Sequence, residues 1–137
     1  MKTRAFLAAI AGIATAFITI FVIEMIGMRL FPVEQRIRPE NYEQLKLMMA
    51  SIPVGALITV SIGHGLSVLA GAFVINRIEA SAMVGMLILF VLILVSTIMN
   101  LVALPHPLWF MITDIALVIL GGLLSWKLFN WKGSFLS

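Results

Sequence analysis

The chain has 137 residues, of which 62% are hydrophobic and 11% are charged, and its formal net charge is +3 at neutral pH. A soluble domain usually has about 25% charged residues, so this composition argues against a water-soluble domain and predicts one domain, 1–137, with the lipid bilayer as its solvent. The chain has no cysteine, which excludes disulfides and thiolate chemistry, and its few scattered basic residues predict no nucleic-acid partner.

Apolar segments at residues 5–30, 53–76, 80–104 and 107–129 can each cross a hydrocarbon core of about 30 Å at about 1.5 Å per residue. The sequence therefore predicts an all-α integral membrane four-helix bundle. The first segment follows MKTR and has the start of a signal peptide, but its apolar run from Ala5 to Ile23 exceeds an ordinary h-region and no A-x-A-like site follows. We expect it to be a retained spanning helix.

The first span carries an acid, Glu24, in the stretch FITIFVIEMIGMRLFP, residues 17–32. Charged groups inside a membrane cost free energy and are functional candidates by default. Counting from Leu30 places Glu24 roughly 10 Å below the outer boundary, and counting from Pro107 places Asp114 of the fourth span at a similar depth. Asn100 of the third span lies close to the same boundary. We expect Glu24, Asn100 and Asp114 to form a buried polar cluster with the acids facing inward.

This expected cluster has two interpretations. Two acids close together in a low dielectric do not readily both ionise, so one proton is shared or retained, which indicates a proton or cation site. The alternative is an interhelical hydrogen-bond cluster, into which Arg29 or Arg36 can reach.

The loop between the first two spans, residues 31–52, is the only sizeable polar segment. Pro39 and Glu40 suit a helix start, and a bend is expected at Pro53. The segment predicts a short interfacial helix whose apolar side chains can face the membrane surface. These side chains are Tyr42, Leu45, Leu47 and Met49.

The second span carries a small residue at every fourth position, which places these residues on one helix face. Small residues let neighbouring helix backbones approach closely in lipid. This helix-packing ridge consists of Gly55, Thr59, Gly63, Ser67 and Gly71. Its continuity predicts close packing and suits self-association or docking against a partner.

His64 lies on the same span, near the bilayer midplane, between Gly63 and Gly65. The glycines can clear room for a flat ligand, so haem or chlorophyll ligation is one interpretation. Packing or hydrogen bonding to a partner molecule is the interpretation we prefer, and no metal or other cofactor is expected. The other histidine, His106, belongs to PHPLW, which predicts a rigid turn that presents Trp109 to the membrane interface.

Orientation follows from the basic residues, because an even number of spans puts both termini on one side. The basic residues on the terminal side lie close to helix ends, where the positive-inside rule applies best, so we expect both termini in the cytoplasm. That side holds Lys2, Arg4, Arg77, Lys127 and Lys132, and the other side holds Arg29, Arg36, Arg38 and Lys46.

No recognised catalytic pattern occurs in the sequence. G-x-S-x-G, H-E-x-x-H and a Walker-type glycine loop are all missing, and His64 with Ser61 or Ser67 is a weak nucleophile and base pair. The sequence predicts that the protein is not an enzyme.

Two short resemblances add expectations. PHPLWF and IPVGAL resemble markers of uncharacterised small bacterial four-span membrane proteins, which implies a bacterial inner membrane and no particular activity. IEMIG and IPVGALITVSIGHG are similar to the first two helices of the small multidrug resistance transporters. That resemblance implies that Glu24 is a proton-exchanging carboxylate, with Pro53, Gly55, Gly63 and Gly65 matching the second helix of the family.

Two functional hypotheses follow. The leading hypothesis is a non-catalytic accessory or scaffolding subunit of a larger bacterial membrane complex, which binds other membrane subunits or further copies of itself through the small-residue ridge. The competing hypothesis is a dimeric proton-coupled small-molecule transporter that uses Glu24 as its coupling site.

Overall fold

The computed structural model describes residues 2–33 and 39–129. All regular structure in these residues is helical, and four of the helices are long and apolar enough to cross a membrane. The predicted all-α four-helix bundle with a short additional helix is therefore confirmed, and its exposed apolar helices imply contact with lipid. The elements are α1 (Lys2–Leu30), α2 (Tyr42–Ala50), α3 (Val54–Ile78), α4 (Met83–Ala103) and α5 (Leu108–Leu128).

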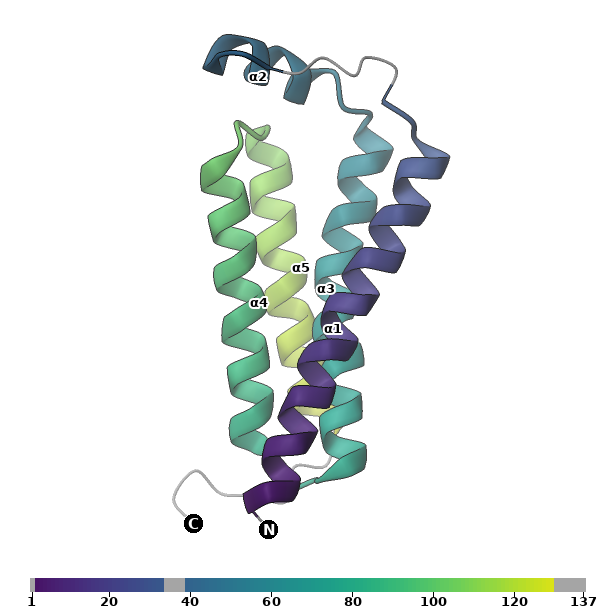
Figure 1. Cartoon of the computed structure of the whole chain (residues 1–137), viewed down its shortest axis with the longest axis vertical. Helices are drawn as coiled ribbons and strands as arrows, with labels where there is room; N and C mark the ends of the chain where they lie inside the picture. The colour runs from purple at the N-terminus through teal and green to yellow at the C-terminus, as the bar shows by residue number, and fades with distance from the viewer. Residues whose placement is uncertain (1, 34–38, 130–137) are drawn as a thin grey trace.

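α3 is the central helix of the bundle. Half of its most apolar window is buried, against 17% for α1, 28% for α4 and 33% for α5. α1 crosses the bundle obliquely and packs mainly on α3, while α5 packs on another side of α3 with α4 beside it (Figure 1). The start of α1 and the end of α5 lie at one end of the bundle, here called the N-terminal end, and α2 lies across the opposite end, the α2 end (Figure 1).

The apolar core divides into two clusters. The larger cluster joins α1, α3, α4 and α5 through fully or almost fully buried residues such as Ala16, Ile75 and Leu89. The smaller cluster, Leu57, Leu101 and Phe110, lies near the α2 end. Because the two clusters are separate along the bundle, polar groups and cavities are accommodated between and beside them.

α2 begins later than the sequence predicts. The Asn41 side chain accepts a hydrogen bond from the backbone N–H of Gln44 at 2.9 Å, and the Gln44 side chain accepts one from the N–H of Glu40 at 2.8 Å. This reciprocal capping pattern fixes the helix start at Tyr42 rather than at Pro39 and Glu40. α3 then begins directly after Pro53, where the bend is expected.

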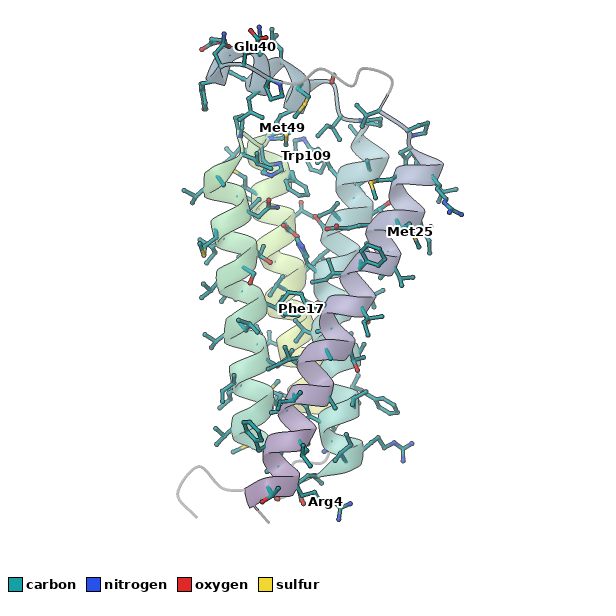
Figure 2. The ribbon with its side chains drawn as sticks, viewed as in Figure 1. Arg4, Phe17, Met25, Glu40, Met49 and Trp109 are labelled. Atoms are coloured by element: carbon teal, nitrogen blue, oxygen red, sulfur yellow. The ribbon has the colours of Figure 1, made fainter. Side chains whose placement is uncertain are left out.

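The apolar side chains of α2 do not all face the same way. Tyr42 and Leu47 are 64% and 70% exposed, whereas Met49 is only 3% exposed. The sequence predicts that Met49 faces the membrane surface, and this is wrong, because the side chain points into the bundle. Met49 and Trp109 both lie at the α2 end, and Arg4 lies at the N-terminal end (Figure 2).

The small-residue ridge of α3 packs against α1 within the chain. A methyl group at Gly71 would lie 2.7 Å from the Gly12 carbonyl oxygen, and one at Gly63 would lie 3.3 Å from the Ile23 side chain. Gly27 of α1 meets Thr59 in the same way. The ridge is therefore occupied inside the chain and is not the free docking face that the sequence suggests.

The N-terminal end is held by contacts around Glu79, which follows α3. Arg4 donates from Nε to the Ile78 carbonyl at 3.0 Å, and the same nitrogen lies 3.9 Å from Glu79 Oε2. Ser81 donates from both its hydroxyl and its backbone N–H to Glu79 Oε1, at 2.7 and 3.2 Å. These hydrogen bonds are the main reason that the pKa of Glu79 lies below its ordinary value.

Candidate functional site

Three titratable side chains from three spans meet inside the bundle. His64 of α3 places Nδ1 2.8 Å from Oδ1 of Asp114 on α5. Its other nitrogen, Nε2, lies 4.0 Å from Oε1 of Glu24 on α1. We refer to Glu24, His64 and Asp114 as the polar trio. In the described residues no hydrogen bond or ion pair joins the two acids directly, so His64 is the link between them.

The glycines beside His64 explain why it lies between α1 and α5. Gly63 faces Ile23 of α1, whereas a methyl group at Gly65 would lie 2.8 Å from the Leu117 carbonyl oxygen of α5. Each glycine thus lets one neighbouring helix approach α3, and His64 sits where the two helices come together. Because these glycines have no side chain, α1 and α5 can both pack closely on α3 at this point.

The space at these glycines is therefore filled by protein. Ile23 and Leu117 occupy this space, so the two glycines give no support to the interpretation that they clear room for a haem or chlorophyll at His64. The expected partner of His64 from another molecule is likewise replaced by Asp114 of the same chain.

Burial increases stepwise through the polar trio. The Glu24 side chain is 39% exposed, the His64 side chain is 10% exposed, and Asp114 is fully buried. Oδ2 of Asp114 has no hydrogen-bond partner among the described residues. A buried oxygen without a partner raises the free energy of the folded protein. The fold therefore does not supply all the hydrogen bonds that the polar trio can accept.

Asn100 lies beside Glu24 instead of joining Asp114. Its side chain has no hydrogen bond in the part of the chain that the structure describes, and it lines the same two cavities as Glu24. Arg29 is exposed and pairs with no acid among the described residues, while Arg36 lies outside them. The predicted cluster of Glu24, Asn100 and Asp114 is thus divided, with His64 between the acids and Asn100 at the cavity wall.

The wide cavity, about 610 Å³, lies toward the α2 end and has walls from all five helices. Glu24 and Asn100 line it together with apolar side chains that include Phe31, Leu57 and Phe110. Its volume is in the range of cavities that hold drug-sized molecules.

The narrow cavity, about 200 Å³, lies among α1, α3 and α4. Phe17 of α1, labelled in Figure 2, lines it together with Ile20 and Ile93. Its polar lining consists of Glu24, His64, Ser96, Thr97 and Asn100. Because these polar groups can bind water and the volume suffices for several water molecules, the narrow cavity can hydrate the inner side of Glu24. Glu24 and Asn100 line both cavities and so mark their junction.

His106 is a second histidine of the wide cavity. Both of its ring nitrogens are buried without a hydrogen-bond partner in the described residues, and its ring lies 4.7 Å from that of Phe110. Burial lowers the pKa of His106 below its ordinary value, against an opposing effect of the Asp114 charge, so the imidazole is neutral at physiological pH. The sequence predicts only a rigid turn here, because nothing in PHPLW shows that the ring turns inward.

The ionised polar trio is one positive charge short. Two carboxylates and one imidazolium leave a net negative charge, and within the described ranges the ion pairs of the trio join its members only to one another. Leaving a charge unbalanced in a membrane interior is costly, about 3 kcal/mol for an acid at a helix centre on insertion scales. An additional proton, or the cationic group of a ligand, supplies the missing charge. Over residues 2–33 and 39–129 no cluster of His, Asp and Glu is arranged to hold a metal ion.

No protein-family model matches the chain, and no curated protein or solved structure matches it at a significant level.

Proposed function

We propose that this membrane protein is a proton-coupled carrier of a small molecule, in which Glu24 exchanges a proton for the ligand. The observation that supports this best is the position of Glu24. It lines the wide cavity on one side and lies 4.0 Å from a histidine that is bonded to a buried acid on the other. A carrier needs one group that responds both to the proton and to the ligand, and Glu24 is in reach of both.

The exchange follows from charge balance. With a proton on Glu24 and His64 positively charged beside Asp114, the trio carries no net charge. When a ligand cation enters the wide cavity, it can replace that proton and keep the trio neutral. The gap between His64 and Glu24 exceeds hydrogen-bond length, so a proton crosses it through one water molecule or after a small side-chain rotation.

The accessory-subunit hypothesis has less support from the geometry. Its main observation is the ridge on α3, and that ridge packs against α1 of the same chain. The sequence hypothesis of a dimer is retained in the proposal, since α1 is the least buried of the spans and offers a long apolar face to a second copy.

We also propose a bacterial inner membrane and a cytoplasmic N-terminal end. Among the described residues this end has Lys2, Arg4, Arg77 and Lys127, and the α2 end has Arg29 and Lys46. Lys132, Arg36 and Arg38 belong to the same expectation but lie outside the described residues.

The test combines isolation and transport. Gentle extraction followed by native mass determination is expected to give a small homo-oligomer. Vesicles containing the protein and an enclosed pH dye are then expected to show proton flux that depends on an added ligand, drawn from a panel of amines and neutral amphiphiles. Glu24→Gln should abolish this flux, whereas Glu43→Gln, which removes an exposed carboxylate on α2, should preserve it.

A stoichiometric complex with larger subunits, together with no ligand-dependent flux, would contradict the carrier proposal. It would favour the accessory-subunit hypothesis instead.

A further inference from the structure

We propose that the wide cavity is a binding site for an amphiphilic amine that keeps at least one N–H bond, with its ammonium group between Glu24 and Asn100. The inference rests on the proposed function for its role in transport, but binding itself can be measured without transport. Four features of the cavity carry it: charge, apolar walls, hydrogen-bonding groups at the junction with the narrow cavity, and a separate imidazole.

Charge selects a cation. Among the described residues that line the wide cavity, Glu24 is the only acid, His106 is neutral, and there is no lysine or arginine. An anionic ligand would face Glu24 with no compensating group. An ammonium group at Glu24 supplies the positive charge that the polar trio lacks.

The walls select an apolar body. Phe31, Leu57 and Phe110 line the cavity, and Met49 reaches it from α2. A small hydrated amine would leave these walls uncovered and would lose the shell of water around its ammonium group. A body of drug-like size covers them, and removing that apolar surface from water favours binding.

The polar groups at the cavity junction select N–H donors. The Glu24 carboxylate and the Asn100 amide oxygen both accept hydrogen bonds, and the Asn100 side chain has no partner among the described residues. A primary ammonium can donate to both, whereas a quaternary ammonium can donate to neither. Phe31 and Phe110 line the wide cavity but not the narrow one, so they lie away from the strip that Glu24 and Asn100 share.

His106 adds a second polar contact. Its ring nitrogens lack partners in the described residues although they are buried, and it lines the wide cavity but not the narrow one. A neutral imidazole can donate one hydrogen bond and accept another. The ligand is therefore expected to carry a neutral hydrogen-bonding group, such as an amide, sulfonamide or hydroxyl, at a distance from its amine.

The experiment uses the full chain in lipid nanodiscs and three fluorescent probes with one dansyl sulfonamide body. The probes end in a primary amine (dansylcadaverine), in its trimethylammonium analogue, or in a carboxylate. Saturable fluorescence enhancement is expected for the primary amine. The trimethylammonium probe should bind at least tenfold more weakly, and the carboxylate should show no saturable binding. Nanodiscs without protein measure partition into lipid.

Variants assign the contacts. Glu24→Gln and Asn100→Ala should each weaken binding of the primary amine, by about tenfold or more for Glu24→Gln, and Asn100→Ala should reduce the preference over the trimethylammonium probe. His106→Ala should weaken binding of the primary amine and of the trimethylammonium probe by the same factor. Glu43→Gln is the matched control, because it removes a carboxylate that lines neither cavity, and it should leave binding unchanged.

Equal affinity for the primary and quaternary probes, saturable binding of the carboxylate, or unchanged binding in Glu24→Gln would overturn the proposal. Fluorescence enhancement no larger than that in protein-free nanodiscs would also overturn the proposal. Binding that depends on Glu24 without any ligand-dependent proton flux would retain this site and refute the carrier function. Flux with other ligands but no amine binding would retain the carrier function and refute this binding site.

Discussion

Nδ1 of His64 lies 2.8 Å from Oδ1 of Asp114, and this pair links α3 to α5 through groups that are almost or fully buried. The acid that the sequence places in the fourth span is thus matched to the histidine of the second. Because the other His64 nitrogen points toward Glu24, the pair connects the most buried acid of the bundle to the one that borders both cavities.

The His64 and Asp114 pair should contribute measurably to stability. A double-mutant cycle with His64→Ala, Asp114→Ala and the double variant is expected to give an interaction energy of about 1 kcal/mol, typical of interhelical hydrogen bonds in membranes. Each single variant leaves a buried polar partner without its hydrogen bond. The two single losses in the free energy of unfolding should therefore add up to more than the loss in the double variant. Reversible unfolding in mixed micelles measures the four free energies. Purely additive effects would show that the pair is not coupled.

Alanine substitutions on either side of His64 should differ sharply. A methyl group at Gly65 would lie 2.8 Å from the Leu117 carbonyl oxygen, so α5 must move, whereas one at Gly63 meets only the Ile23 side chain at 3.3 Å. Gly65→Ala is therefore expected to lower the free energy of unfolding by about 1–3 kcal/mol, and Gly63→Ala by much less. The same unfolding assay compares them, with Gly63→Ala as the matched control. Equal losses would mean that α5 does not approach α3 as closely as described.

The acid Glu79 should titrate below its ordinary range. Its pKa is lowered from 4.5, mainly by the hydrogen bonds from Ser81, with a smaller contribution from Arg4. A carboxyl group with a lowered pKa in the folded protein contributes stability above its unfolded pKa, and this contribution is lost as pH falls through the folded value. Ser81→Ala should raise the pKa of Glu79 toward 4.5, as carbon-13 NMR of the labelled carboxyl group can measure. A pKa that stays low in Ser81→Ala would assign the effect to the Ser81 backbone N–H and the charge of Arg4 instead of the hydroxyl.

Mild acid should destabilise the α2 end through His106. Burial lowers the pKa of His106 from 6.5, so the folded protein binds this proton less tightly than the unfolded chain does. The stability associated with the neutral ring is complete above pH 6.5 and is lost as pH falls from there toward the lowered value. The melting temperature of wild type should therefore fall more between pH 7.5 and 5.5 than that of His106→Gln. The other ionisable groups are present in both proteins, so their contributions cancel in the comparison.

The position of His64 shows where sequence reasoning fails. Counting residues gives the depth of Glu24 and Asp114, because the rise per residue of a helix is fixed. It does not give the tilt of α1 or the rotation of α5, which depend on how closely the glycines of α3 let each helix approach. The triplet Gly63, His64 and Gly65 indicates close approach of both helices, since each glycine faces a different helix. The sequence alone, however, is equally consistent with clearance for a ligand.

His106 gives the same lesson for a loop. Two flanking prolines predict a turn, yet whether the imidazole turns outward or inward depends on Phe110 and on the volume of the wide cavity. Met49 is similar, because the spacing of apolar residues on α2 does not tell which of them faces the bundle.

The sequence by itself determined the spans, the helix-forming loop segment and the presence of acids within the spans, because length, hydropathy and the cost of charge in lipid are properties of local composition. Only the tertiary structure decided which polar groups meet, that the small-residue ridge is used within the chain, and that Glu24 borders two cavities. The physical reason is that these features depend on the rotation and tilt of one helix against another. In lipid, close packing of small groups sets the rotation and the tilt, and the periodicity of a single segment does not specify either of them.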